Sequence, residues 1–202
     1  TDGSASSSSL LPSVLILTPL KNAVGHLDRY LANVRRLAYP RHRLSLALMD
    51  SDSDDAPDAA VVAKVRALVA RGYLPELLLR WLDDTAPVPA AAVPTPGKPR
   101  DVLAAVQAEQ DAQRRRRSST AFRPSATLYR LLAELPALQA DGFAAVTVFQ
   151  HNFGFSLDRG SRHGEGFQLQ RRRVLALSRN HLLATALRER QWVLWLDSDL
   201  FT

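Results

Sequence analysis

The chain has 202 residues, of which 46% are hydrophobic and 23% are charged, which is typical of a folded globular domain and excludes a wholly disordered chain. It has no cysteine, which excludes disulfides and thiolate metal sites. The formal net charge is +6, and almost all of the positive charge is arginine, whose planar guanidinium suits phosphate. Composition therefore admits diphosphates, nucleic acid and anionic lipid as partners and does not choose among them. No segment reaches the roughly 18 to 20 apolar residues of a membrane-spanning helix, and no signal peptide is visible.

The first part of the chain alternates short apolar runs with segments of helical spacing. After a serine-rich segment, which we expect to be a flexible lead-in over residues 1–12, β-branched residues and leucines predict a buried strand. Apolar residues at 27, 30, 31, 34 and 37 then predict a helix. In chain order, the predicted elements are a strand at 14–18, a helix at 27–37, a strand at 44–49, a helix at 59–69 and a third strand at 77–82.

The composition changes after residue 83, where proline and alanine dominate. We interpret residues 84–124 as a low-complexity insertion that contains a short helix at 102–112. Regular patterning then returns, with a helix at 128–140, a strand at 144–150, a helix at 172–188 and a strand at 192–196.

Strands that alternate with helices predict an α/β fold, with a mostly parallel sheet and helices on its faces. Ligands of such sheets bind beyond the carboxyl ends of the strands. Three predicted strand ends therefore matter most for function, namely the loops at 19–26, 50–55 and 197–199.

The last of these loops carries the strongest candidate site. Asp197 and Asp199 follow the apolar run Trp192-Val-Leu-Trp-Leu, so both carboxylates project from the end of a buried strand. Oxygen ligands suit hard divalent cations, which bridge diphosphates and stabilise a departing diphosphate as Lewis acids. An Asp-x-Asp match by itself is weak, because a solvated acidic turn gives the same pattern.

The acidic run at 50–55 is a second candidate. Asp50 or Asp52 is placed to contact the ribose or base of a nucleotide, as acidic residues after early strands do in doubly wound folds. A solvated acidic loop explains the same residues about equally well.

Two basic runs complete the candidates. Arg172 and Arg179 lie seven residues apart, share a face of the predicted helix, and could neutralise a diphosphate opposite Asp199. The alternative is a basic surface face, although arginines at a helix amino terminus oppose its dipole, which hints at a use. The run at 114–117 lacks the interleaved aromatic residues of a nucleic-acid site and is better explained as a solvated linker.

Several segments together resemble the fungal Golgi mannan polymerase subunits, which are alpha-1,6-mannosyltransferases of glycosyltransferase family 62. The similarity covers residues 14–82 and 125–202. The matching motifs are Val14-Leu-Ile-Leu-Thr-Pro-Leu-Lys21-Asn22, His26-Leu-x-x-Tyr30, Tyr39-Pro40, Asp50-Ser51-Asp52, Gln150-His151-Asn152-Phe153-Gly154, Arg162-His163, Arg172-Arg173, Ser178-Arg179-Asn180-His181-Leu182-Leu183 and Trp192-Val-Leu-Trp-Leu-Asp197-Ser-Asp199.

The resemblance implies a GT-A fold, of which this chain would be the amino-terminal half within residues 13–202. It also implies a GDP-mannose donor, a Mn²⁺ ion, and retaining transfer of mannose to a mannan or N-glycan acceptor in protein glycosylation for the fungal cell wall. The family's motifs assign catalytic roles to Asp197, Asp199 and Arg172, and the metal ion to Asp199 and Asp197. Donor contacts are assigned to Thr18, Pro19, Asp50, Asp52, Arg172, Arg179 and Asp197.

The implied setting is a complex of homologous mannosyltransferase subunits in the Golgi membrane, with a lumenal catalytic domain and a type II anchor outside this sequence. We expect the 202-residue chain to be inactive by itself, because the family continues beyond the Asp-x-Asp motif. Two other functions remain open, namely a non-catalytic scaffold or donor-binding subunit, and, more weakly, a nucleic-acid binder.

Overall fold

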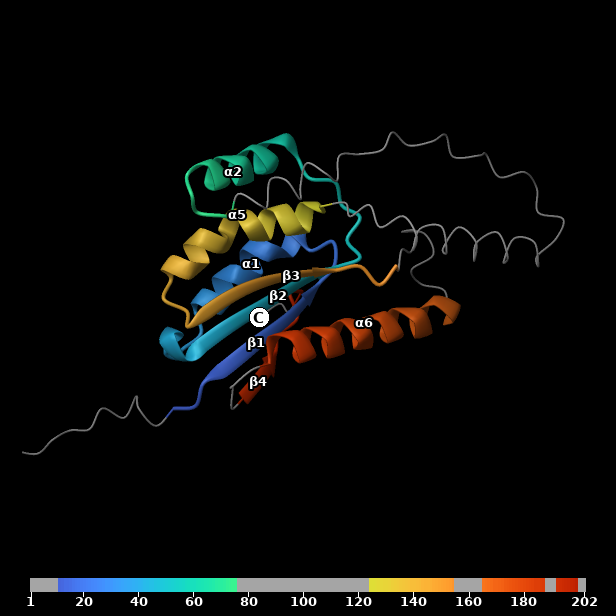
Figure 1. Cartoon of the computed structure of the whole chain (residues 1–202). Helices are drawn as coiled ribbons and strands as arrows, with labels where there is room; N and C mark the ends of the chain where they lie inside the picture. Colours follow the sequence, from blue (N-terminus) through green and yellow to red (C-terminus); the bar gives the residue numbers. More distant parts are fainter. Residues whose placement is uncertain (1–10, 76–123, 155–164, 188–191, 200–202) are drawn as a thin grey trace, which may run out of the picture.

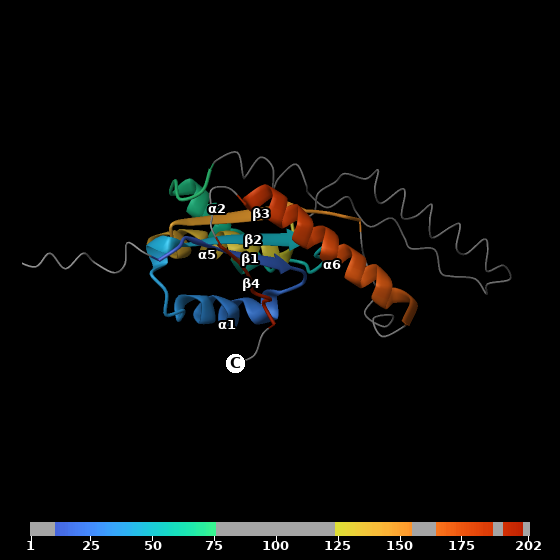
Figure 2. The ribbon, with the colours of Figure 1, turned by 90° about the horizontal axis from the view of Figure 1, so that it is seen from below.

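The computed structural model describes residues 11–75, 124–154, 165–187 and 192–199. Within them, four parallel strands form one sheet in the order β3-β2-β1-β4, as Figure 2 shows from one edge to the other. The strands are β1 (Val14–Leu20), β2 (Leu44–Ser51), β3 (Ala145–His151) and β4 (Trp192–Trp195). The predicted α/β fold with a parallel sheet is therefore confirmed.

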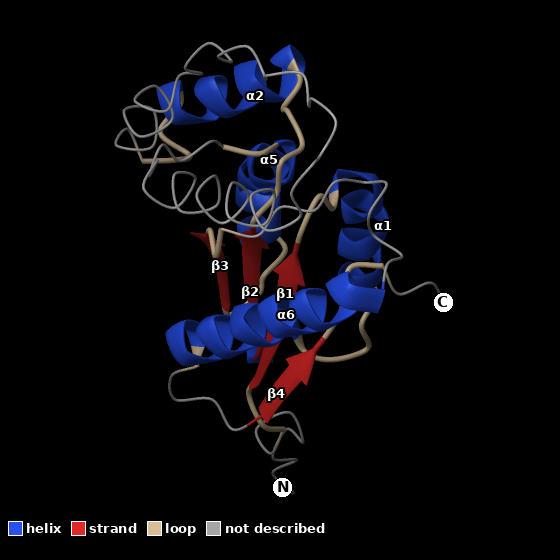
Figure 3. Cartoon of the chain, turned by 90° about the vertical axis from the view of Figure 1, so that its right-hand side faces the viewer, coloured by secondary structure: helices blue, strands red, loops and turns tan. Residues whose placement is uncertain are grey.

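Helices cover both faces of this sheet (Figure 1). One face packs against α1 and α5, and the other packs against α6, which runs across the strands (Figure 3). The outer helix α2 packs on α5, and Val148 of β3 also packs against the cluster of buried side chains between these two helices. The helices are α1 (Val24–Arg35), α2 (Ala59–Ala70), α5 (Ala126–Ala140) and α6 (Glu165–Ala186), and a short 3₁₀ turn, η2 (Arg41–Arg43), precedes β2.

The hydrophobic core explains why β1 and β2 occupy the middle of the sheet. Every residue of β2 is buried, and four apolar residues of β1 are at most 2% exposed. Alternate side chains of these strands serve opposite faces, because Ile16 and Leu46 contact the α1 and α5 side whereas Leu17 and Met49 contact α6. A strand that is buried on both faces has the continuous apolar pattern from which these two elements were predicted.

Polar side chains begin two of the helices. Asp58 accepts a hydrogen bond from the Val61 backbone at 2.8 Å at the start of α2, and Ser125 accepts one from the Leu128 backbone at 2.9 Å at the start of α5. These side chains satisfy amide groups that have no partner inside the helix, which fixes where each helix begins.

Several predicted boundaries differ from the structure by one or more residues. The first strand continues through Pro19 to Leu20, because proline tolerates an extended backbone at a strand end. The first helix occupies 24–35 instead of 27–37. The helix predicted from 172 begins at Glu165, so the arginines at 171–173 lie nearly two turns inside it, and the prediction that they oppose the dipole at its amino terminus is wrong.

Other predicted segments lie outside the described residues. These are the strand at 77–82, the helix at 102–112, the arginine run at 114–117 and most of the lead-in. Within the described part of the chain, no helix combines the length and the apolar character needed to cross a membrane.

Candidate functional site

The order of the strands determines where a ligand would bind. The chain proceeds from β1 outward to β2 and β3 on one side, and then returns through α6 to place β4 on the other side of β1. The direction of winding therefore reverses between β1 and β4. In open parallel sheets, the crevice beyond the carboxyl ends of the strands at such a reversal is the usual binding site.

A cavity of about 440 Å³ lies at this reversal, and we call it the switch cavity. Its volume is within the range of roughly 300 to 1,000 Å³ that small-molecule sites occupy. Segments far apart in the sequence line it, because the ends of β1 and β4 are neighbours and α6 crosses both. The lining residues are Pro19, Lys21, Asn22, Ala23, His26, Arg171, Leu175, Asp197, Ser198 and Asp199.

Charges of both signs line the switch cavity. Asp197 and Asp199 come from the end of β4, whereas Lys21 follows β1 and Arg171 belongs to α6. The structure thus brings the predicted Asp-x-Asp motif together with two cations. From the sequence, Arg171 was noted only as part of a basic run and Lys21 only as part of a motif, and neither was given a role, although the position of Lys21 directly after a predicted strand was a usable signal.

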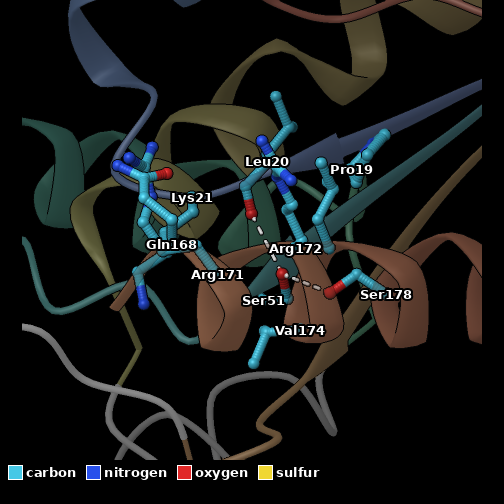
Figure 4. Close-up of a pocket in the computed structure, with 10 residues that line it drawn as sticks. Pro19, Leu20, Lys21, Ser51, Gln168, Arg171, Arg172, Val174 and Ser178 are labelled. Carbon is cyan, nitrogen blue, oxygen red and sulfur yellow. Dashed lines mark hydrogen bonds between the residues drawn. The ribbon is translucent and has the colours of Figure 1, made fainter. Parts of the chain in front are cut away.

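A second cavity of about 300 Å³ adjoins the first and shares Pro19, Lys21, Arg171 and Leu175 with it. We call it the α6 cavity, and Figure 4 shows its lining side chains around that helix. Its remaining lining residues are Leu20, Ser51, Gln168, Arg172, Val174 and Ser178. The predicted site residues Pro19 and Arg172 therefore lie at this pair of cavities.

A short chain of hydrogen bonds connects the elements around the α6 cavity. The Ser51 hydroxyl donates to the Leu20 carbonyl at 3.4 Å and lies 3.2 Å from the Ser178 hydroxyl (Figure 4). Both serines are buried. Because these contacts join β1, β2 and α6, they fix the helix that carries Arg171 and Arg172 over the strand ends.

Arg179 contacts the Asp-x-Asp motif itself. Its Nη2 donates to both carboxylate oxygens of Asp197 at 3.0 Å, and its guanidinium lies 5.5 Å from the centroid of the Trp195 ring. Arg179 is not among the residues that line either cavity. Its predicted contact with a diphosphate stays a prediction, whereas its contact with Asp197 is part of the structure.

Asp50 is enclosed by the fold. It is 2% exposed, one carboxylate oxygen accepts a hydrogen bond from Ser53, and the other accepts one from the Ser125 hydroxyl at 2.6 Å. Burial raises the pKa of Asp50 to about 6, against the lowering effect of these two hydrogen bonds. Neither Asp50 nor Asp52 lines either cavity, so their predicted contacts with a nucleoside stay predictions.

Asn22 links the loop after β1 to the loop after β2. Its side-chain amide donates to Asp54 at 2.6 Å, and its side-chain oxygen accepts from the backbone amides of Asp54 and Asp55 at 2.9 and 3.2 Å. The backbone amide of Asn22 donates to Ser53 at 2.8 Å, and its φ of 49° is an unusual conformation that asparagine tolerates. This network, which the sequence did not reveal, fixes the backbone on one side of Lys21.

Thr18 occupies the core and not a cavity. It is fully buried and hydrogen-bonded at 2.5 Å to the hydroxyl of Tyr30 in α1, and burial raises the pKa of Tyr30. Thr18 lines neither cavity, and its predicted donor contact stays a prediction.

The residues present fit one kind of metal site. In the described part of the chain, no group of three or more His, Cys, Asp or Glu side chains could hold a metal ion. The two carboxylates of the Asp-x-Asp motif suit a cation that takes one or two protein ligands and completes its shell with substrate phosphates and water. They do not form an all-protein cage.

Comparison with known proteins agrees with these features. The Anp1 family model matches residues 1–202. The chain belongs to the Anp1 family. A relative from Schizosaccharomyces pombe, named mannan polymerase II complex anp1 subunit, is 25% identical over 192 residues, which cover 94% of this chain and 30% of that protein. The resemblance stated from the motifs is thereby confirmed at the level of the family.

Proposed function

We propose that this Anp1-family chain is the donor-binding part of a metal-dependent mannosyltransferase. It would take mannose from GDP-mannose and add it to a mannan or N-glycan acceptor in alpha-1,6 linkage, with retention of configuration. We place the enzyme in the Golgi membrane, as a subunit of a mannan polymerase complex with homologous subunits.

One observation carries the proposal. The Asp-x-Asp motif, Lys21 and Arg171 line a single cavity at the reversal point of a parallel sheet. A nucleotide-sugar needs both kinds of charge there, because its diphosphate is anionic and is commonly bridged to carboxylates by a divalent cation. Packing of apolar side chains would not by itself bring two carboxylates and two cations to one cavity.

Each charged residue of the two cavities would have its own role in binding the donor or the cation. Lys21 and Arg171 would bind the diphosphate from two elements, and Arg172 would contact the part of the donor that enters the α6 cavity. Asp199, which is exposed at the end of the motif, would hold the cation. When bound, that cation would stabilise the negative charge of the departing nucleoside diphosphate.

The relative from S. pombe supports the complex and the chemistry at a coarser level. Its name states that it is a subunit of a mannan polymerase complex. The present chain spans 30% of the length of that relative, so activity, acceptor and subunit contacts belong to the proposal.

The test is made on the full-length protein, in which Asp199 is replaced. Asp199→Ala should lower mannose transfer from GDP-mannose about 100-fold or more, since the loss of a Lewis acid removes several kcal/mol of transition-state stabilisation. Transfer is measured with a radiolabelled donor, and GDP binding in the presence of Mn²⁺ is measured by calorimetry. Asp28→Ala is the matched control, because Asp28 is 75% exposed on α1 and lines neither cavity.

The second candidate is a non-catalytic scaffold or donor-binding subunit. The observation in its favour is that the described residues supply carboxylates for only part of a cation shell. It predicts that a complex in which this chain alone carries Asp199→Ala transfers mannose at the wild-type rate. If that complex transfers mannose at the wild-type rate and still binds GDP, this chain acts as a scaffold or donor-binding subunit and not as the catalyst.

A further inference from the structure

The starting observation is that the two carboxylates of the Asp-x-Asp motif have different surroundings. Both oxygens of Asp197 accept hydrogen bonds from Arg179, and its side chain is 43% exposed. Asp199 is exposed and carries no ion pair that the structure records among the described residues. The two aspartates of the motif therefore differ: Asp197 is paired with Arg179, whereas Asp199 has no ion pair among the described residues.

Arg179 is well placed to maintain this division. It lies in α6 one residue after Ser178, which is buried and contacts Ser51 of β2. The Cζ atom of its guanidinium lies over the Trp195 ring at the end of β4, 5.5 Å from the ring centroid, which is within the range of a cation–π interaction. The side chain is thus held from two elements while its Nη2 meets Asp197.

The pairing has an electrostatic consequence. A carboxylate whose two oxygens are engaged by a guanidinium attracts a second cation less than a free carboxylate does, because the two positive charges repel each other. Arg179 lines neither cavity, so its influence reaches the ligand through Asp197.

We propose that Arg179 is a positioning residue that neutralises Asp197, so that Asp199 alone of the motif binds the divalent cation and Asp197 serves as an oriented hydrogen-bond acceptor for the donor. This inference rests on the proposed function. It assigns to Arg179 a role other than binding the diphosphate.

The test measures Mn²⁺ binding with no nucleotide present, by water-proton relaxation, which detects weakly bound Mn²⁺. Asp199→Asn should weaken binding about tenfold or more, whereas Asp197→Asn should weaken it less, about threefold, because it leaves the charge of Arg179 unpaired near the cation. Arg179→Gln should strengthen binding about three- to tenfold, because it releases the charge of the Asp197 carboxylate. The double variant Arg179→Gln with Asp197→Asn should return to the wild-type affinity.

Two further variants separate charge from folding. Arg179→Lys keeps a cation that can reach Asp197 and should bind Mn²⁺ like the wild type. Arg173→Gln removes another arginine from α6 that is exposed and lines neither cavity, and should change nothing. Melting temperatures are recorded for every variant, and a purely structural role would lower the melting temperature of Arg179→Gln while leaving its Mn²⁺ affinity at the wild-type value.

Equal weakening by Asp197→Asn and Asp199→Asn would overturn the inference, since both carboxylates would then be ligands. It is also overturned if Asp197→Asn fails to reverse the effect of Arg179→Gln, or if Arg179→Gln leaves Mn²⁺ binding unchanged. Absence of Mn²⁺ binding by the wild type would remove the cation from the proposed function and this inference with it, and calorimetry with GDP would then test the nucleotide part separately.

Discussion

At the scale of single residues, the acidic run after β2 shows how position in the fold changes the meaning of a carboxylate. Asp50 was predicted to face a ligand, yet its oxygens accept hydrogen bonds from Ser53 and Ser125. Ser125 also begins α5, so the carboxylate joins the end of β2 to the start of that helix. An interior carboxylate of this kind affects stability through its protonation.

The protonation of Asp50 should make stability depend on pH. Its pKa is raised from 3.8 to about 6, so the folded state binds the proton more tightly than the unfolded chain does. The resulting stabilisation is fully present below about pH 4 and is lost as the pH rises through about 6, with a total on the order of 3 kcal/mol.

Asp50→Asn should remove this dependence, because an amide has no proton to lose in that range. We expect the free energy of unfolding in urea, measured at intervals between about pH 4 and about pH 7, to fall in the wild type and to stay flatter in the variant. Asp28→Asn, an exposed carboxylate, should retain the wild-type slope. Parallel slopes for wild type and Asp50→Asn would contradict the assignment.

At the scale of elements, two histidines contribute to the contact between β3 and α6. The ring centroids of His151 at the end of β3 and His181 in α6 are 4.2 Å apart, and Phe153 lies 4.3 Å from His151. Burial, and then the proximity of His181, lower the pKa of His151, against the opposing charge of Asp52. The neutral form of His151 is therefore the one that the folded state favours.

A lower pH should loosen α6 on the sheet. Because the pKa of His151 is lowered, the stability it contributes is present above 6.5, its ordinary value, and is lost as the pH falls through the lowered value. Amide hydrogen exchange in α6, corrected for intrinsic rates, should be faster at about pH 5 than at about pH 7. His181→Phe should reduce this difference and His42→Phe, in η2, should not, whereas equal protection at both pH values would refute the idea.

At the scale of the whole molecule, β4 forms an exposed edge of the sheet. Among the described residues it pairs only with β1, and Trp192, Val193 and Leu194 are 62%, 37% and 42% exposed. An unpaired apolar edge strand is a template for association with other chains. The same strand leads into the Asp-x-Asp motif, so contacts at this edge also bear on the switch cavity.

The 202-residue chain expressed by itself should therefore associate with itself. Sedimentation velocity should detect species larger than the monomer that increase with concentration, and Trp192→Lys with Leu194→Lys should reduce them. Tyr73→Lys is the control, because Tyr73 is 57% exposed and follows α2 on the far side of α5. A monomer at all concentrations would show that the edge is already protected.

Much of the fold followed from local sequence patterns. Continuous apolar runs identified β1 and β2, and helical spacing identified α1, α2 and α5, because burial imposes these periods on neighbouring residues. The Asp-x-Asp motif was recognisable because Asp197 directly follows an apolar run. The prediction that this run forms a buried strand is wrong, because the first three residues of β4 are exposed. The boundaries were less accurate, as the seven-residue error at the start of α6 illustrates.

Only the tertiary structure decided what meets that motif. The sequence predicted five strands without their order, and the one at 77–82 lies outside the described residues. Because β1 and β4 are neighbours in the sheet, Lys21 and Asp199 line the same cavity. Likewise, Asp50 meets Ser125 across 75 positions, a pairing that no local period encodes. Periodicity determines which face of an element is buried, whereas the order of strands and the crossing of α6 determine which buried or charged side chains become partners, as Arg179 and Asp197 do here.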